Sequence, residues 1–116
     1  MVIKLATGLD DPERVAQAFS VASTALAAGV EVSFWFTGEA SWLALPGRAE
    51  EFNLAHAANL ADLLANLIDE AQVTLCSQCA VRRNIKDGDQ ISGIAIAGST
   101  TFVEEIMRAQ TQALVY

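Results

Sequence analysis

The sequence is poor in positive charge. Its 116 residues carry 7 Lys and Arg against 14 Asp and Glu, so the formal net charge is −7 at pH 7. No run of basic residues interrupts this balance, and an acidic surface is repelled by the phosphate backbone of nucleic acids. We therefore expect no nucleic-acid partner and interpret the acidity as that of a solvated surface.

The sequence also lacks a long apolar run. Its longest uncharged stretch, residues 15–30, contains polar side chains, shows a helical periodicity, and is shorter than the ~20 apolar residues that a membrane span needs. Residues 1–9 carry Lys4 inside an apolar segment, whereas a signal peptide places its positive charge before that segment. These features predict a cytoplasmic protein that does not enter a membrane.

The composition excludes disorder. Hydrophobic residues make up 53 % of the chain, which favours extensive burial and leaves room for a subunit interface. A chain of this length builds one core but not two. We expect residues 1–116 to form a single domain.

Extended and helical patterns alternate along the chain. β-branched, aromatic and apolar runs predict strands at residues 2–7, 30–36, 71–75, 91–97 and 113–116, and apolar stripes at helical spacing predict helices after residues 11, 59, 76 and 98. Residues 39–58 are less regular and predict a short helix plus a loop. This order predicts an α/β fold, with a parallel sheet covered by helices on both faces and right-handed connections.

Local signals predict where the helices begin and end. Asp11 and Pro12 are suited to the start of the first helix, and Gly29 is suited to a left-handed stop. Thr101 and Glu104 have the spacing of a capping box at the start of the last helix.

The two cysteines lie together at the predicted end of the third strand. Cys76 and Cys79 are followed by Arg82 and Arg83. Reaction sites in parallel sheets form outside the carboxyl ends of the strands. A cysteine at a strand-to-helix junction meets the free N–H groups of the first helical turn, which stabilise a thiolate, and a nearby arginine adds to this effect. Cys79 would lie one turn further on the same face, so a reversible disulfide or sulfur passing between the two is possible.

Other interpretations of these residues stay open. Both cysteines could be small buried hydrophobic residues. Zinc is poorly supported, because a closed site needs four ligands and only distant His56 and carboxylates would join the two thiols. A thioredoxin-type motif usually follows an early strand, whereas this one follows three. His56 alone among apolar residues is more often structural than a base, and residues 98–101, which could bind an anion at a helix start, are adequately explained by capping.

Four segments of the chain are distinctive when taken together: the Val-Ile-Lys-Leu opening, the Asp-Asp-Pro-Glu-Arg helix start, the Ala-Gly-Val-Glu-Val segment, and Leu-Cys-x-x-Cys-Ala-x-Arg-Arg-Asn-Ile. In these segments and in the order of its elements the chain resembles the DsrE/DsrF-like family. The most specific part of the resemblance is Cys76 at the strand end, followed by residues 82–85. Relatives commonly show Arg-Gly and an aliphatic residue there. Asn84 stands where glycine is usual, and asparagine tolerates the left-handed conformation well.

The resemblance implies a three-layer α/β/α sandwich with a mainly parallel five-stranded sheet, assembled as a trimer or hexamer. It also implies a sulfur carrier that takes sulfane sulfur as a persulfide on Cys76 from a donor protein and passes it to an acceptor, with no metal or organic cofactor. On this hypothesis Cys79 resolves the persulfide or receives the sulfur, and Arg82 or Arg83 stabilises the thiolate. The alternatives are a non-catalytic oligomeric interaction module and a dithiol redox protein.

Overall fold

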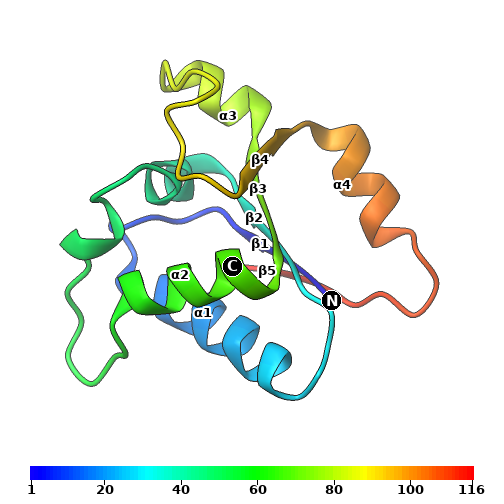
Figure 1. The fold of residues 1–116 in the computed structure, drawn as a ribbon, viewed down its shortest axis with the longest axis horizontal. Coiled ribbons are helices and arrows are strands. Elements are labelled where there is room, and N and C mark those ends of the chain that lie inside the picture. Colours follow the sequence, from blue (N-terminus) through cyan, green and yellow to red (C-terminus); the bar gives the residue numbers. More distant parts are fainter.

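In the computed structural model, which describes all 116 residues, five parallel strands form one sheet in the order β4-β3-β2-β1-β5 (Figure 1). The strands are β1 (Val2–Leu5), β2 (Ser33–Phe36), β3 (Gln72–Cys76), β4 (Ile94–Ala97) and β5 (Ala113–Val115). The helices are α1 (Pro12–Ala27), α2 (Leu60–Glu70), α3 (Ser77–Arg82) and α4 (Ser99–Ile106), with two 3₁₀ helices, η1 (Gly38–Ala44) and η2 (Ala49–Glu51). No helix is both long enough and apolar enough to cross a membrane.

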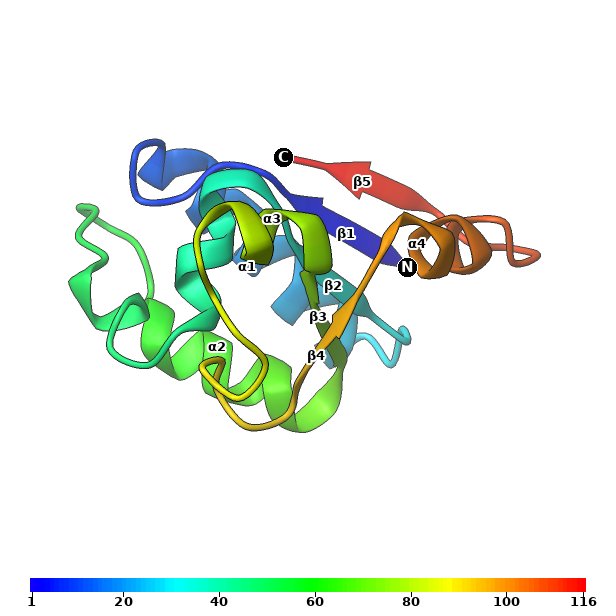
Figure 2. The ribbon, with the colours of Figure 1, turned by 90° about the horizontal axis from the view of Figure 1, so that it is seen from above.

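The helices form layers on both faces of the sheet, which confirms the predicted three-layer architecture (Figure 2). α1 and α2 pack against each other on one face, while α4 lies on the other. The strand order explains this placement. The chain steps from β1 through β2 and β3 to β4 in one direction, and it must then return past them to reach β5 beside β1. α4 makes this return across the free face.

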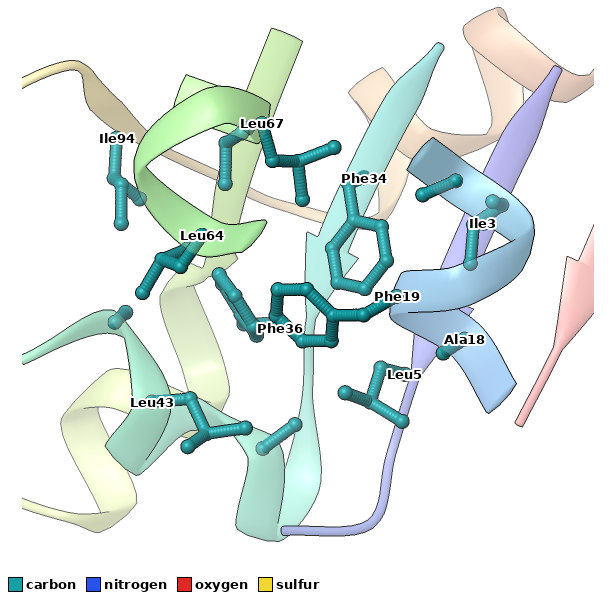
Figure 3. Close-up of a cluster of buried hydrophobic side chains, with 14 of the residues drawn as sticks. Ile3, Leu5, Ala18, Phe19, Phe34, Phe36, Leu43, Leu64, Leu67 and Ile94 are labelled. Atoms are coloured by element: carbon teal, nitrogen blue, oxygen red, sulfur yellow. The ribbon is translucent and has the colours of Figure 1, made fainter. Parts of the chain in front are cut away.

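The core lies between the sheet and the α1–α2 layer (Figure 3). Phe34 and Phe36 alternate along β2 and point to this face, where Phe19 of α1 meets both rings at centroid distances of 5.0 and 6.2 Å. These contacts lie in the range at which aromatic rings attract each other beyond simple burial. They hold the carboxyl end of β2 rigidly, and this end adjoins the cysteine motif.

The face under α4 is more polar. Trp35 points to it, because its neighbours in β2 point the other way, and its ring contacts Phe102 of α4 edge to face at 5.3 Å. Glu105 of α4 is 1 % exposed. Its carboxylate accepts hydrogen bonds from Ser33 Oγ at 2.7 Å, Trp35 Nε1 at 2.8 Å and Gln72 Nε2 at 3.1 Å. A buried carboxylate therefore joins α4 to β2 and β3.

Some local predictions are confirmed and others are wrong. Asp11 caps α1 by accepting from the Arg14 N–H, and Gly29 has a φ of 78° just beyond the end of α1. The capping box at Thr101 is wrong, because α4 begins at Ser99 and its N-cap is Gly98, with no side-chain cap. Strands β2 and β4 begin three residues later than predicted, and the irregular section 39–58 contains two 3₁₀ helices in place of one short helix.

Candidate functional site

The cysteine motif lies where the sequence places it, at the carboxyl end of β3. Cys76 is the last residue of the strand and also the N-cap of α3, in an extended conformation with φ −62° and ψ 122°. It pairs in register with Ala97, the last residue of β4, and its predecessor Leu75 pairs with Phe36, the last residue of β2. The ends of three neighbouring strands therefore surround the motif.

The two thiols differ in exposure. Cys76 is partly exposed, whereas Cys79 is 8 % exposed, and both are free. The N-cap and the third helical position are the pair whose side chains meet across the first turn of a helix. This geometry turns Cys79 inward beneath Cys76. Only Cys76 is open to a second molecule.

Cys79 is held by a backbone group from another part of the chain. The N–H of Gly38 points at its sulfur, with an N···S distance of 3.2 Å. Gly38 begins η1 just after β2, and its positive φ of 50° aims the N–H at the sulfur. The neighbouring Cys76 thiol also favours the thiolate form of Cys79 and so acts to lower its pKa.

The contacts around Cys79 lower the pKa of its thiol. Burial alone raises the pKa of the Cys79 thiol, because it penalises the thiolate. The Gly38 N–H, the Cys76 thiol and the positive charges of Arg83 and Arg82 together outweigh burial, so the pKa of Cys79 lies below the ordinary thiol value. Cys79 is thus a buried thiol whose surroundings favour the thiolate form.

We expect the ultraviolet absorbance of the Cys79 thiolate to appear at a pH below the ordinary thiol pKa of about 8.5. The same rise in absorbance should be absent from Cys79→Ser. A group whose pKa is lowered by folding stabilises the fold above the unfolded pKa, and this stabilisation is lost as the pH falls through the folded pKa. The Tm of wild type should therefore rise relative to that of Cys79→Ser as the pH increases towards about 8.5. Equal pH dependence in the two proteins would contradict a thiolate at Cys79.

The two arginines act on the Cys79 thiol through their charge. Arg83 Nη2 forms an ion pair with Glu39 at 2.7 Å, and Nη1 donates to the carbonyl oxygen of Cys79 at 3.3 Å. Its guanidinium lies 6.0 Å from the centre of the Trp42 ring. Arg82 is exposed, and no hydrogen bond joins either guanidinium to a sulfur. Arg83 thus ties α3 to η1, and its charge, like that of Arg82, favours the thiolate.

The end of α3 explains the asparagine of the motif. Asn84 has a φ of 54°, the left-handed conformation that glycine adopts most readily and asparagine tolerates. The N–H of Asn84 donates to the Val81 carbonyl and that of Ile85 to the Ala80 carbonyl, at 3.1 and 2.9 Å. This is a Schellman motif, and its apolar residue Ile85 is buried. It stops the helix directly after Arg83.

Sequence reasoning missed the contributions of η1. Gly38, Glu39 and Trp42 reach the site although they precede Cys79 by about 40 residues. The available signal was the position of Gly38, because the ends of neighbouring parallel strands meet at one edge of a sheet. His56 is not brought to the site. It lies in a loop with φ 61° and lines an apolar pocket of about 520 Å³ bounded by α1 and α2.

No group of three or more His, Cys, Asp and Glu side chains lies close enough to hold a metal ion.

The fold and the site define a class of protein: small α/β proteins with a parallel five-stranded sheet and a cysteine pair at the carboxyl edge of the sheet. The sequence profile of the DsrE/DsrF-like family matches residues 2–112. The chain belongs to this family.

Solved structures share the fold at low sequence identity. The ychN protein from E. coli superposes with a TM-score of 0.78 at 16 % identity, covering 99 % of this chain and 97 % of the other. MTH1491, a protein of unknown function from Methanobacterium thermoautotrophicum, superposes with a TM-score of 0.76 at 11 % identity, covering 99 % and 96 %. A comparison with curated protein sequences finds no significant match.

Proposed function

We propose that the protein is a sulfur carrier that accepts sulfane sulfur as a persulfide on Cys76. The observation that carries the proposal is the unequal thiol pair, in which a partly exposed Cys76 lies over a buried Cys79 that favours the thiolate form. Membership of the DsrE/DsrF-like family is consistent with a role in sulfur relay.

The pair supplies a nucleophile and a base for the transfer. As the Cys76 sulfur attacks the outer sulfur of a donor persulfide, the Cys79 thiolate takes the Cys76 proton. In a variant without Cys79 a buffer base takes this proton, so the transfer is slower but still reaches completion. The bond between the two donor sulfurs breaks, and the donor leaves as a thiolate. Cys79 returns the proton to this thiolate, so Cys76 ends as a persulfide and Cys79 is again a thiolate. No metal or organic cofactor takes part in these steps.

The surroundings of Cys76 support a protein as donor or acceptor. Four residues of α3, the helix that starts directly after Cys76, bound a shallow hollow of about 310 Å³, namely Ser77, Gln78, Val81 and Arg82. Val81 is 77 % exposed there and offers a partner an apolar contact. Our proposal includes a cytoplasmic homo-oligomer, a trimer or hexamer, that meets its sulfur donor and acceptor proteins at this surface.

Intact-mass measurement tests the proposal with two matched variants. After incubation with a sulfane-sulfur donor and removal of the excess, Cys79→Ser should gain the mass of one sulfur atom per chain, and Cys76→Ser should gain none. An unchanged Cys79→Ser, or an equal gain on Cys76→Ser, would overturn it. Circular dichroism of both variants shows that they are folded, and light scattering of the same samples measures their assembly.

Dithiol redox chemistry is a second candidate. It is favoured by the placement of the two cysteines at the N-cap and the third position of α3, whose side chains meet across the first turn of the helix. In this case the pair would oxidise and reduce reversibly without sulfane sulfur. A pair that cannot be oxidised in the folded protein would exclude this candidate.

A further inference from the structure

We infer that Cys79 discharges the Cys76 persulfide within the same chain, so that the outer sulfur leaves as hydrosulfide and a Cys76–Cys79 disulfide remains. This inference rests on the proposed function, because it needs a persulfide on Cys76. It adds a product, sulfide, and a requirement for a dithiol reductant that restores the starting state.

The geometry places the two sulfurs for this reaction. Cβ atoms three residues apart on a helix lie about 5–6 Å from each other, and a disulfide brings them to about 3.5–4.5 Å. Cys76 is the N-cap of α3 and Cys79 its third residue, the two positions whose side chains meet across the first turn of a helix. A closing of this first turn by about 1–2 Å between the Cβ atoms lets the two sulfurs bond.

Burial decides what Cys79 does with the sulfur. At 8 % exposure its sulfur lies beneath Cys76 and against the N–H of Gly38, so an acceptor protein cannot reach it. A persulfide formed on Cys79 would add a sulfur atom to this enclosed space and could not be handed on. Attack on the inner sulfur of Cys76 adds no atom there, because the outer sulfur departs on the exposed side.

The surrounding contacts hold Cys79 in place as the attacking group. Gly38 N–H lies 3.2 Å from its sulfur, and Arg83 binds the Cys79 carbonyl at 3.3 Å while paired with Glu39 at 2.7 Å. These contacts fix the first turn of α3 against η1. Cys79 is thus positioned for the attack without help from a partner protein.

The step balances in atoms and electrons. The thiolate of Cys79 attacks the inner sulfur of the persulfide, which is the Sγ atom of Cys76. The outer sulfur carries a proton at this stage. A new S–S bond forms between the two cysteines, the bond between Cys76 and the outer sulfur breaks, and its electron pair leaves with that sulfur as HS⁻. The sulfane sulfur is reduced to sulfide and the two cysteines are oxidised to a disulfide.

This chemistry sets the place of the protein in a reaction sequence. A reaction that produces sulfane sulfur bound to a protein or small thiol must come before it. A dithiol–disulfide exchange must follow, because one disulfide is left for each sulfide released. Without a reductant the wild type should complete a single turnover and stop.

The test compares wild type with Cys79→Ser and Cys79→Ala, all reduced first and freed of reductant. After one equivalent of a sulfane-sulfur donor, wild type should release about one sulfide per chain and lose the mass of two hydrogen atoms. Both variants should keep the added sulfur and release no sulfide. A dithiol reductant added to wild type should restore further turnovers.

The outcomes separate this inference from the proposed function. If the wild type keeps the added sulfur and releases no sulfide, the inference is overturned but the proposed function is not. The same holds if the added sulfur is found on the peptide that carries Cys79. Variants that take up no sulfur would overturn the proposed function itself. Because the decisive readings come from wild type, they hold even if one variant fails to fold.

Discussion

Replacing Gly38 by alanine should lower the free energy of unfolding by about 2–4 kcal/mol and raise the pKa of the Cys79 thiol. Gly38 has a φ of 50°, where an ordinary residue costs about 1–2 kcal/mol. A Cβ built on it would lie 2.6 Å from the carbonyl oxygen of Ala6, which is backbone and cannot turn away. That oxygen also accepts the Glu39 N–H at 3.1 Å, so the start of η1 must shift.

The same shift withdraws the N–H that lies 3.2 Å from the Cys79 sulfur. Burial of the thiol would then be opposed by fewer favourable contacts, so its pKa should rise. Urea unfolding measures the first effect, and the ultraviolet titration of the thiolate measures the second.

Gly47→Ala is the matched control. Gly47 also has a positive φ, 83°, but a Cβ there would meet no atom within 4 Å. We expect a loss of about 1 kcal/mol, from the backbone conformation alone, with the thiolate titration unchanged. Equal losses at both glycines, with the Cys79 pKa unmoved by Gly38→Ala, would refute the role given to Gly38.

The second large effect is expected at Glu105. Its replacement by alanine removes the carboxylate that accepts from Ser33, Trp35 and Gln72. Trp35 is the buried donor, and the loss of its partner costs about 1–3 kcal/mol, while Ser33 and Gln72 are more exposed and can turn to water. We therefore expect the free energy of unfolding to fall by about 2–3 kcal/mol. α4 should then loosen from the sheet, and hydrogen exchange of its amides should accelerate.

Glu104→Ala is the control for this prediction. Glu104 is the exposed neighbour of Glu105 in α4, and it makes no hydrogen bond through its side chain. Its replacement should change stability by no more than about 0.5 kcal/mol. If the two variants unfold at the same urea concentration, Glu105 does not hold α4 to the sheet.

The sequence was sufficient to predict the features that depend on local pattern. Alternating strands and helices predicted the parallel sheet with helices on both faces. The end of β3 at Cys76 followed from an apolar run that meets a polar helix start. Asn84 adopts the left-handed conformation that its position in the motif indicated.

The features that sequence did not predict depend on contacts between distant segments. The Gly38 N–H reaches Cys79 across 41 residues, and no local pattern encodes that distance. Glu105 belongs to a helix whose other acidic residue is exposed, so its composition gave no sign that one carboxylate is buried. Thr101 has the spacing of a cap but lies inside α4, because the strand before it ends at Ala97 and the helix begins at once.

These distant contacts change the meaning of the cysteine pair. From sequence, Cys76 was the principal residue and Cys79 an optional assistant. In the fold, Cys79 receives the Gly38 N–H and the charge of Arg83, and its pKa is lowered, while Cys76 has the exposure that a second molecule needs. Our proposal therefore assigns both thiols a part, with Cys76 as the acceptor of sulfur.

Locating the sulfur on Cys79→Ser tests this assignment most directly. The variant is incubated with a sulfane-sulfur donor, alkylated and digested, and the peptides are measured by mass spectrometry. We predict one added sulfur per chain, on the peptide that carries Cys76. If an excess of donor leaves the Cys76 peptide without added sulfur, the claim that this protein carries sulfur on Cys76 is contradicted.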